Sequence, residues 1–132
     1  MNAPDIEGFW SSAEEMAEFL LDADDVTVVA HIDADGVSSA SIASSSLERA
    51  GVPHTVRFIK KLDPPEMERV NMERTEAVWL VDLGSGSYSQ LRHPGACVSD
   101  HHVPDMRARG LQRSGQNTLF SVSYTHLTLP TN

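Results

Sequence analysis

The stretch Val26-Thr-Val-Val-Ala-His-Ile-Asp-Ala-Asp-Gly36 decides how the rest of this chain is interpreted. Val26–Ala30 is a short apolar run rich in β-branched residues, which is the composition of a strand buried on both faces of a parallel sheet. Polar residues follow at alternate positions, and the final glycine allows a tight turn. If the segment stays extended, His31, Asp33 and Asp35 share a face and bring one imidazole and two carboxylates together.

This group of side chains has the composition of a metal site. Two neighbouring carboxylates repel each other unless a shared proton or a divalent cation neutralises them. An imidazole beside carboxylates suits Mn²⁺, Zn²⁺ or Fe²⁺, whereas oxygen ligands alone would suit Mg²⁺ or Ca²⁺ better. The alternative is a solvated strand end with an Asp-Ala-Asp turn that holds no ion.

Length, charge and composition restrict the class of protein. The chain has 132 residues, enough for one domain with a buried core, and its 40% hydrophobic content argues against disorder. The formal net charge of −9 repels nucleic acid unless metals or another domain supply positive charge. Because there is no long apolar run and no signal-peptide pattern, we expect a cytoplasmic protein with no membrane partner. The one cysteine, Cys97, is expected to be a small buried residue rather than a nucleophile.

Apolar strands alternate with helical patterns, which predicts an α/β fold with an open, mainly parallel sheet and helices on both faces. The first helix is expected to begin at Ser12, which has capping-box spacing to Glu15. The expected helices are Ser12–Leu21, Val37–Ala50, Pro64–Val70 and about Tyr88–Arg92, and the expected strands are Val26–Ala30, His54–Ile59, Ala77–Val81 and Ala96–Ser99.

Two further expected strands also end in residue types that bind metals. Asp82 follows the third strand and precedes a loop of glycines and serines. Asp100, His101 and His102 follow the fourth strand, so one histidine can ligate a metal, its neighbour can face a substrate, and the aspartate can orient an imidazole. The carboxyl ends of parallel strands meet at one edge, where open α/β sheets bind ligands. This group has more candidate ligands than one ion needs, which suggests two metals bridged by a shared carboxylate. Its members are His31, Asp33, Asp35, Asp82, Asp100, His101 and His102.

The helix expected after this first cluster offers a binding site for phosphate. Its free N-terminal amides suit an anion, and Ser38 or Ser39 could touch a substrate. An exposed or sheet-facing serine is the alternative for each of them.

Three strand-end motifs, in the same order along the chain, resemble those of the DHH phosphoesterase superfamily. The resemblance covers roughly Leu20 to Val103 and is close to the archaeal RecJ-like branch of single-strand exonucleases. The family also contains oligoribonucleases, cyclic dinucleotide phosphodiesterases and type II pyrophosphatases. In the pyrophosphatases, the histidine and the first aspartate of the first motif are further apart than His31 and Asp33. The matching segments are His31-Ile32-Asp33-Ala34-Asp35-Gly36, Asp82 with Gly84, and Asp100-His101-His102, the triplet that names the family.

The resemblance implies a Rossmann-like DHH domain and a metal-dependent phosphodiesterase. Such an enzyme hydrolyses single-stranded DNA, RNA or short oligonucleotides with water activated by two Mn²⁺ ions, or by Mg²⁺, and its partners include replication or repair proteins. His102 would contact the scissile phosphate beside Asp100. The implied ligands are His31 and Asp33 for one ion, Asp35 and His101 for the other, and Asp82 as the bridge.

Other functions stay open within the same resemblance. The chain could be a cyclic dinucleotide or nanoRNA phosphodiesterase, an inactive fragment of an enzyme, or a non-catalytic DHH-like scaffold of the kind found in replication complexes. Scaffolds of that kind usually lose metal ligands from these motifs, whereas the ligand types are present here.

The C-terminal part departs from the family's pattern. The family has a further metal-binding Asp well after the triplet, whereas the one Asp that follows here, Asp105, is too close to fit. No DHHA1-type substrate-binding domain follows either, and Ser123–Asn132 resembles a translated adapter sequence. We therefore expect an incomplete, C-terminally truncated DHH-type domain over residues 1–115 and an artefactual tail outside the domain over residues 116–132.

Overall fold

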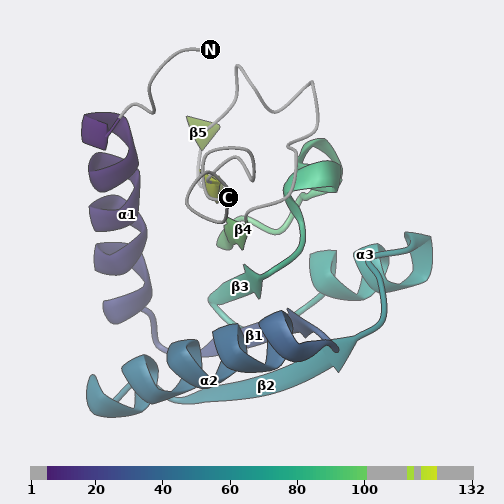
Figure 1. Ribbon diagram of the computed structural model, residues 1–132, viewed down its shortest axis with the longest axis horizontal. Coiled ribbons are helices and arrows are strands. Elements are labelled where there is room, and N and C mark those ends of the chain that lie inside the picture. Colours follow the sequence, from purple (N-terminus) through teal and green to yellow (C-terminus); the bar gives the residue numbers. More distant parts are fainter. Residues whose placement is uncertain (1–5, 101–112, 115–116, 122–132) are drawn as a thin grey trace, which may run out of the picture.

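A six-stranded sheet organises the fold in the computed structural model, which describes residues 6–100, 113–114 and 117–121 (Figure 1). The strand order is β2-β1-β3-β4-β6-β5, and neighbouring strands are parallel except for β5 and β6. The elements are α1 (Ile6–Leu21), β1 (Val26–His31), α2 (Ala34–Arg49), β2 (His54–Ile59), α3 (Pro64–Asn71), β3 (Ala77–Val81), the 3₁₀ helix η1 (Ser85–Gln90), β4 (Ala96–Asp100), β5 (Arg113–Ser114) and β6 (Asn117–Ser121).

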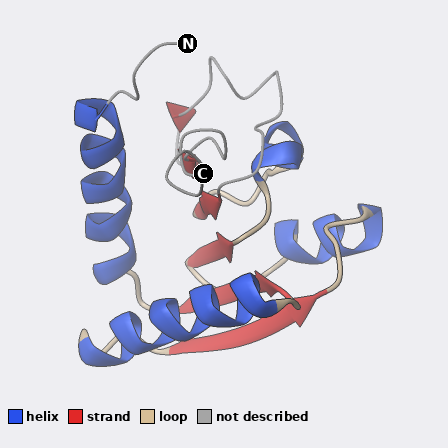
Figure 2. Cartoon of the chain, in the orientation of Figure 1, coloured by secondary structure: helices blue, strands red, loops and turns tan. Residues whose placement is uncertain are grey.

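Helices cover both faces of the sheet (Figure 2). Alternate residues of a strand point to opposite faces, so adjacent residues of β1 belong to different cores. Val28 packs with Leu20 of α1 and Leu47 of α2, whereas Val29 packs with Val70 of α3 and with η1. The predicted α/β fold with an open, mainly parallel sheet is therefore confirmed.

The predicted start of the first helix is wrong. α1 begins at Ile6, so Ser12 lies inside the helix and cannot form a capping box with Glu15. Met16 and Leu20 of this helix are buried in the core, each 3% exposed.

The turn after β1 also differs from its prediction. The strand ends at His31 and α2 begins at Ala34, three residues earlier than expected, so the segment does not stay extended as far as Asp35. Asp33 instead caps the helix, because its carboxylate accepts the Gly36 N–H. The helical conformation from Ala34 is favoured over an extended one because the Asp33 cap satisfies a helix N–H that would otherwise have no partner.

The predicted domain boundary at residue 115 does not coincide with the end of the sheet. β6 lies beyond that residue and pairs in parallel with β4, with Val98 opposite Leu119. The stretch from 117 to 121 therefore contributes a strand, although it was expected to be a tail. The other residues of 116–132 lie outside the described part.

Two further predictions concern burial and membranes. Cys97 is buried as expected, and burial raises the pKa of its thiol to about 12. In the described part of the chain, every helix is too short or too polar to cross a bilayer.

Candidate metal centre

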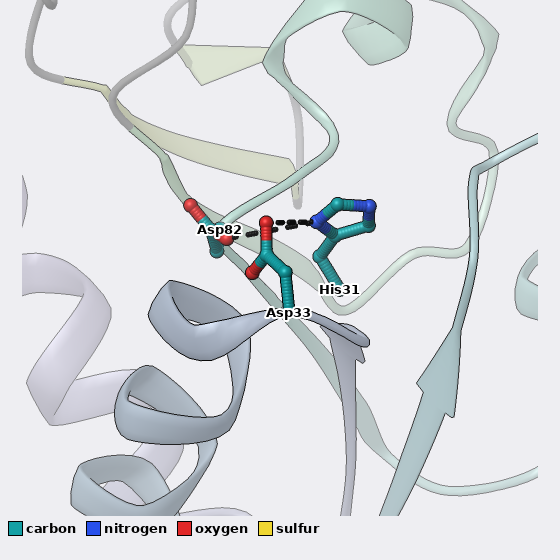
Figure 3. A group of neighbouring side chains, drawn as sticks. All are labelled: His31, Asp33 and Asp82. Atoms are coloured by element: carbon teal, nitrogen blue, oxygen red, sulfur yellow. Dashed lines mark hydrogen bonds and ion pairs between the residues drawn. The ribbon is translucent and has the colours of Figure 1, made fainter.

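Three side chains from separate elements meet at the carboxyl edge of the sheet (Figure 3). β1 and β3 are parallel neighbours, with Ala30 opposite Val81, so the next residue of each chain segment emerges at the same place. The ligand atoms of His31, Asp33 and Asp82 all lie within 4.8 Å of one another. His31 Nδ1 is 2.7 Å from Asp33 Oδ2 and 3.9 Å from Asp82 Oδ2.

Asp33 uses its two carboxylate oxygens for different purposes. Oδ1 accepts the Gly36 N–H at 2.8 Å, and Oδ2 lies against His31. The hydrogen bond from Gly36, followed by the hydrogen bond from His31, keeps the pKa of the Asp33 carboxyl below its usual value. The group is therefore ionised at neutral pH, which is the form that binds a cation.

Gly36 allows the helix to begin this close to the strand. A Cβ atom added there would lie 1.7 Å from the His31 carbonyl oxygen, so no other residue fits the same backbone. The placement of Asp33 beside His31 thus depends on a glycine three residues further on.

Asp82 is held in an unusual backbone conformation. Its φ is 62°, and within the described ranges it is the one non-glycine residue with positive φ. That left-handed conformation costs roughly 1–2 kcal/mol, a strain that proteins tend to keep at functional sites. Its side chain is 3% exposed and its backbone N–H donates to Ser99 O at 2.9 Å. The carboxylate is therefore buried, and the backbone that carries it is bonded to β4.

Asp100, the last residue of β4, is 8% exposed. Its Oδ2 accepts two hydrogen bonds from Ser85, one from the backbone N–H at 3.1 Å and one from the hydroxyl at 2.7 Å. The sequence did not single out Ser85, because nothing in a glycine-serine loop distinguishes it from Ser87 or Ser89. The histidines next to Asp100 lie outside the described residues.

The remaining predicted site residues have different positions. Asp35 is exposed in the first turn of α2 and is not part of the three-residue cluster found among the described residues. Ser38 is exposed and Ser39 half-buried, both beyond the first turn and its free amides. His101 and His102 lie outside the described part, so their roles stay predictions.

The donor set of the cluster fits a divalent transition metal. Ligand atoms about 2.0–2.2 Å from one ion lie no more than about 4.4 Å apart, which is close to the spacing found here. A cation would take the place of the short hydrogen bond between His31 and Asp33. One imidazole and two carboxylates also suit Mn²⁺ better than an ion that prefers oxygen alone.

An open groove of about 760 Å³ lies elsewhere, between α3 and η1. Pro65, Met67 and Met72 contribute apolar surface to it, with Gln90 and Arg92 on the other side. None of the three clustered residues lines this groove. It is therefore not the cavity in which the cluster would act.

Comparison with known proteins identifies the fold but no sequence family. The chain matches no known family model and no curated protein. Its fold is similar to RecJ from Thermus thermophilus in complex with Mn²⁺ (TM-score 0.61, 24% identity, 85% of this chain) and to exonuclease RecJ bound to manganese (0.62, 19%, 85%). CDC45 from Entamoeba histolytica is also similar (0.60, 17%, 89%). The chain spans 17%, 31% and 24% of those three proteins and has the fold that they share.

Proposed function

We propose that this chain carries the metal centre of a DHH-type phosphodiesterase that hydrolyses single-stranded nucleic acid or short oligonucleotides. The observation that carries the proposal is the convergence of His31, Asp33 and Asp82 within 4.8 Å at the edge where α/β sheets bind ligands. Two solved structures with this fold contain manganese, and one of them is an exonuclease. The proposal of replication or repair proteins as partners rests on the family resemblance, and the proposal of a cytoplasmic location rests on the sequence pattern described above.

Each clustered side chain has a defined task in this proposal. His31 and Asp33 would hold one cation, Asp35 and His101 would hold a second, and the buried carboxylate of Asp82 would serve both. His102 contacts the scissile phosphate. Two bound cations would supply a hydroxide near neutral pH and neutralise charge on the phosphoryl oxygens.

The charges of the chain make the cations necessary. A phosphodiester approaching this edge meets the Asp33 and Asp82 carboxylates on a chain whose formal net charge is −9. Like charges at this range repel, so the residues alone would exclude the substrate that they are proposed to bind. Activity should therefore disappear completely in a chelator and return on addition of Mn²⁺.

The test is hydrolysis of an end-labelled single-stranded oligonucleotide with and without Mn²⁺. Asp82→Ala and His101→Ala should each lower the rate by about 100-fold or more, because even residues that only support metal ligands cost 10–100-fold. Asp25→Ala is the matched control, since its carboxylate lies at the opposite edge and accepts the Glu76 N–H at 2.8 Å.

The outcomes separate the candidate functions. Activity that survives both substitutions would contradict the site. Cleavage of cyclic dinucleotides or very short RNA, but not of long single strands, would select the narrower phosphodiesterase function. Binding of Mn²⁺ without hydrolysis of any of these would favour the scaffold or the inactive fragment.

A further inference from the structure

The loop that follows β3 is attached to β4 at two points. At the first, the Asp82 N–H donates to Ser99 O at 2.9 Å, which continues the strand pairing by one residue. At the second, Ser85 donates both its N–H and its hydroxyl to Asp100 Oδ2. Ser85 is 0% exposed, so water does not compete for these bonds.

Between these two points the backbone takes a path that few residues adopt. Asp82 has φ 62° and Gly84 has φ 109°. A side chain at Gly84 would also come within 3.3 Å of Leu80 and Val98. The loop must turn this sharply because only two residues separate Asp82 from Ser85.

An isolated chain would not keep Asp82 in this conformation, since a left-handed aspartate returns to negative φ unless its surroundings hold it. The rotation about φ would redirect the Asp82 side chain away from His31. The second attachment point supplies that restraint, because it fixes the far end of the loop to a buried carboxylate.

We propose that Ser85 and Asp100 are positioning residues that hold Asp82 left-handed and so direct its carboxylate toward the cation shared with His31. The inference rests on the proposed function in one respect, namely that Asp82 binds a cation. In this inference Asp100 acts on Asp82 by holding the loop after β3, in addition to any effect on its histidine neighbours. Ser85 gains a role that the sequence did not indicate.

The test compares Ser85→Thr with Ser85→Val. Threonine and valine have nearly the same shape. Both variants add one methyl group to Ser85, and they differ only in that valine has a second methyl group in place of the hydroxyl. Two quantities are measured: the Cα and Cβ chemical shifts of Asp82 without metal, which distinguish left-handed from extended backbone, and Mn²⁺ affinity by electron paramagnetic resonance titration. We expect Ser85→Thr to behave like the unsubstituted protein and Ser85→Val to bind Mn²⁺ about 10-fold more weakly, with altered Asp82 shifts.

Ser44→Ala is the matched control, because it removes a serine hydrogen bond of 2.7 Å, to His54 Nε2, at the other edge of the sheet. It should leave both the Asp82 shifts and the Mn²⁺ affinity unchanged. If both larger variants fail to fold, Ser85→Ala, which adds no volume, decides by the same two readouts.

The inference is overturned if the Asp82 shifts and the affinity are the same with and without the hydroxyl. The failure of the proposed function looks different: the unsubstituted protein would then bind no Mn²⁺ at all. In that case the metal-free shifts alone decide whether the Ser85–Asp100 pair holds Asp82.

Discussion

His31 lies at the carboxyl edge of the sheet and His93 at the amino edge, and their ring nitrogens face different groups. His93 is 3% exposed; its Nε2 lies 3.1 Å from both Glu73 O and Thr75 O, and its Nδ1 accepts the Gly95 N–H at 3.0 Å. His31 has a side chain 34% exposed, with Nδ1 directed at two carboxylates. A histidine whose nitrogens bind only backbone groups connects loops, whereas one that faces carboxylates at an open edge is available to a ligand.

The aspartates of the two edges differ in the same way. At the amino edge, Asp25 accepts the Glu76 N–H and connects the starts of β1 and β3. At the carboxyl edge, Asp82 takes a strained conformation and turns its carboxylate toward His31. The polar groups of the amino edge thus stabilise the fold. At the carboxyl edge, the strained backbone of Asp82 costs stability but directs a candidate metal ligand toward His31.

Substituting one glycine at each edge should give the largest contrast. Gly36→Ala forces a Cβ to 1.7 Å from the His31 carbonyl oxygen, so the start of α2 must move. We expect a loss of about 3 kcal/mol or more in the free energy of unfolding, measured in urea. Gly51→Ala at the amino edge meets no atom within 4 Å and suffers only from its φ of 74°, so it should cost about 1 kcal/mol. Equal losses would contradict the crowding at Gly36.

Alanine substitution of the two histidines should separate stability from metal binding. His93→Ala removes contacts to three backbone groups and leaves a buried gap, so the free energy of unfolding should fall by about 2–4 kcal/mol with Mn²⁺ affinity unchanged. His31→Ala should lower Mn²⁺ affinity by about 100-fold and change stability little. Calorimetric titration and urea unfolding of both variants check this, and a large stability loss in His31→Ala would break the contrast.

Asp33→Asn separates helix capping from metal binding. Asparagine caps helices as well as aspartate does, so the variant should unfold at nearly the same urea concentration. It loses the negative charge, and Mn²⁺ should bind about 10-fold more weakly or worse. Asp63→Asn is the control, because Asp63 caps α3 by accepting the Glu66 N–H at 3.1 Å and has no part in the cluster. If both variants bound Mn²⁺ equally, Asp33 would be a cap only.

The smallest effect is expected from Cys97, which lies between the two edges. Burial raises the pKa of its thiol from 9.0 to about 12, so the folded protein should resist thiol reagents at pH 8 and react only on unfolding. The unfolded chain loses the proton first as pH rises. The contribution of this thiol to stability is therefore complete below pH 9.0 and disappears toward about pH 12. Rapid labelling of the native protein would contradict its burial.

The sequence predicted the strands better than the helix starts. β2 and β3 have the predicted bounds. β3 is a continuous apolar run between turn residues, and β2 has apolar residues at Val56, Phe58 and Ile59. The starts of α1 and α2 were missed, since a residue such as Asp33 can be extended or a cap until tertiary packing decides. β6 was missed because its short run carries no clear alternation.

For the candidate site, the sequence located residues but not their arrangement. It placed His31, Asp33 and Asp82 at one edge, where the structure brings their ligand atoms together. It did not place Asp35 in the first turn of α2, because the sequence did not predict the early start of that helix. The sequence could not identify Ser85, because its proposed role depends on a contact with a residue 15 positions away.

The divided carboxylate of Asp33 has a thermodynamic consequence. One oxygen holds the first turn of α2 and the other belongs to the cluster, so any cation bound there would also restrain that turn against fraying. Binding of the cation and formation of the first turn of α2 would then be thermodynamically linked. The melting temperature would rise with the logarithm of the free cation concentration once that concentration exceeds the dissociation constant. In such a protein a chelator acts as a mild denaturant, and the amide protons at the start of α2 would be the first to exchange with solvent when the cation is withdrawn.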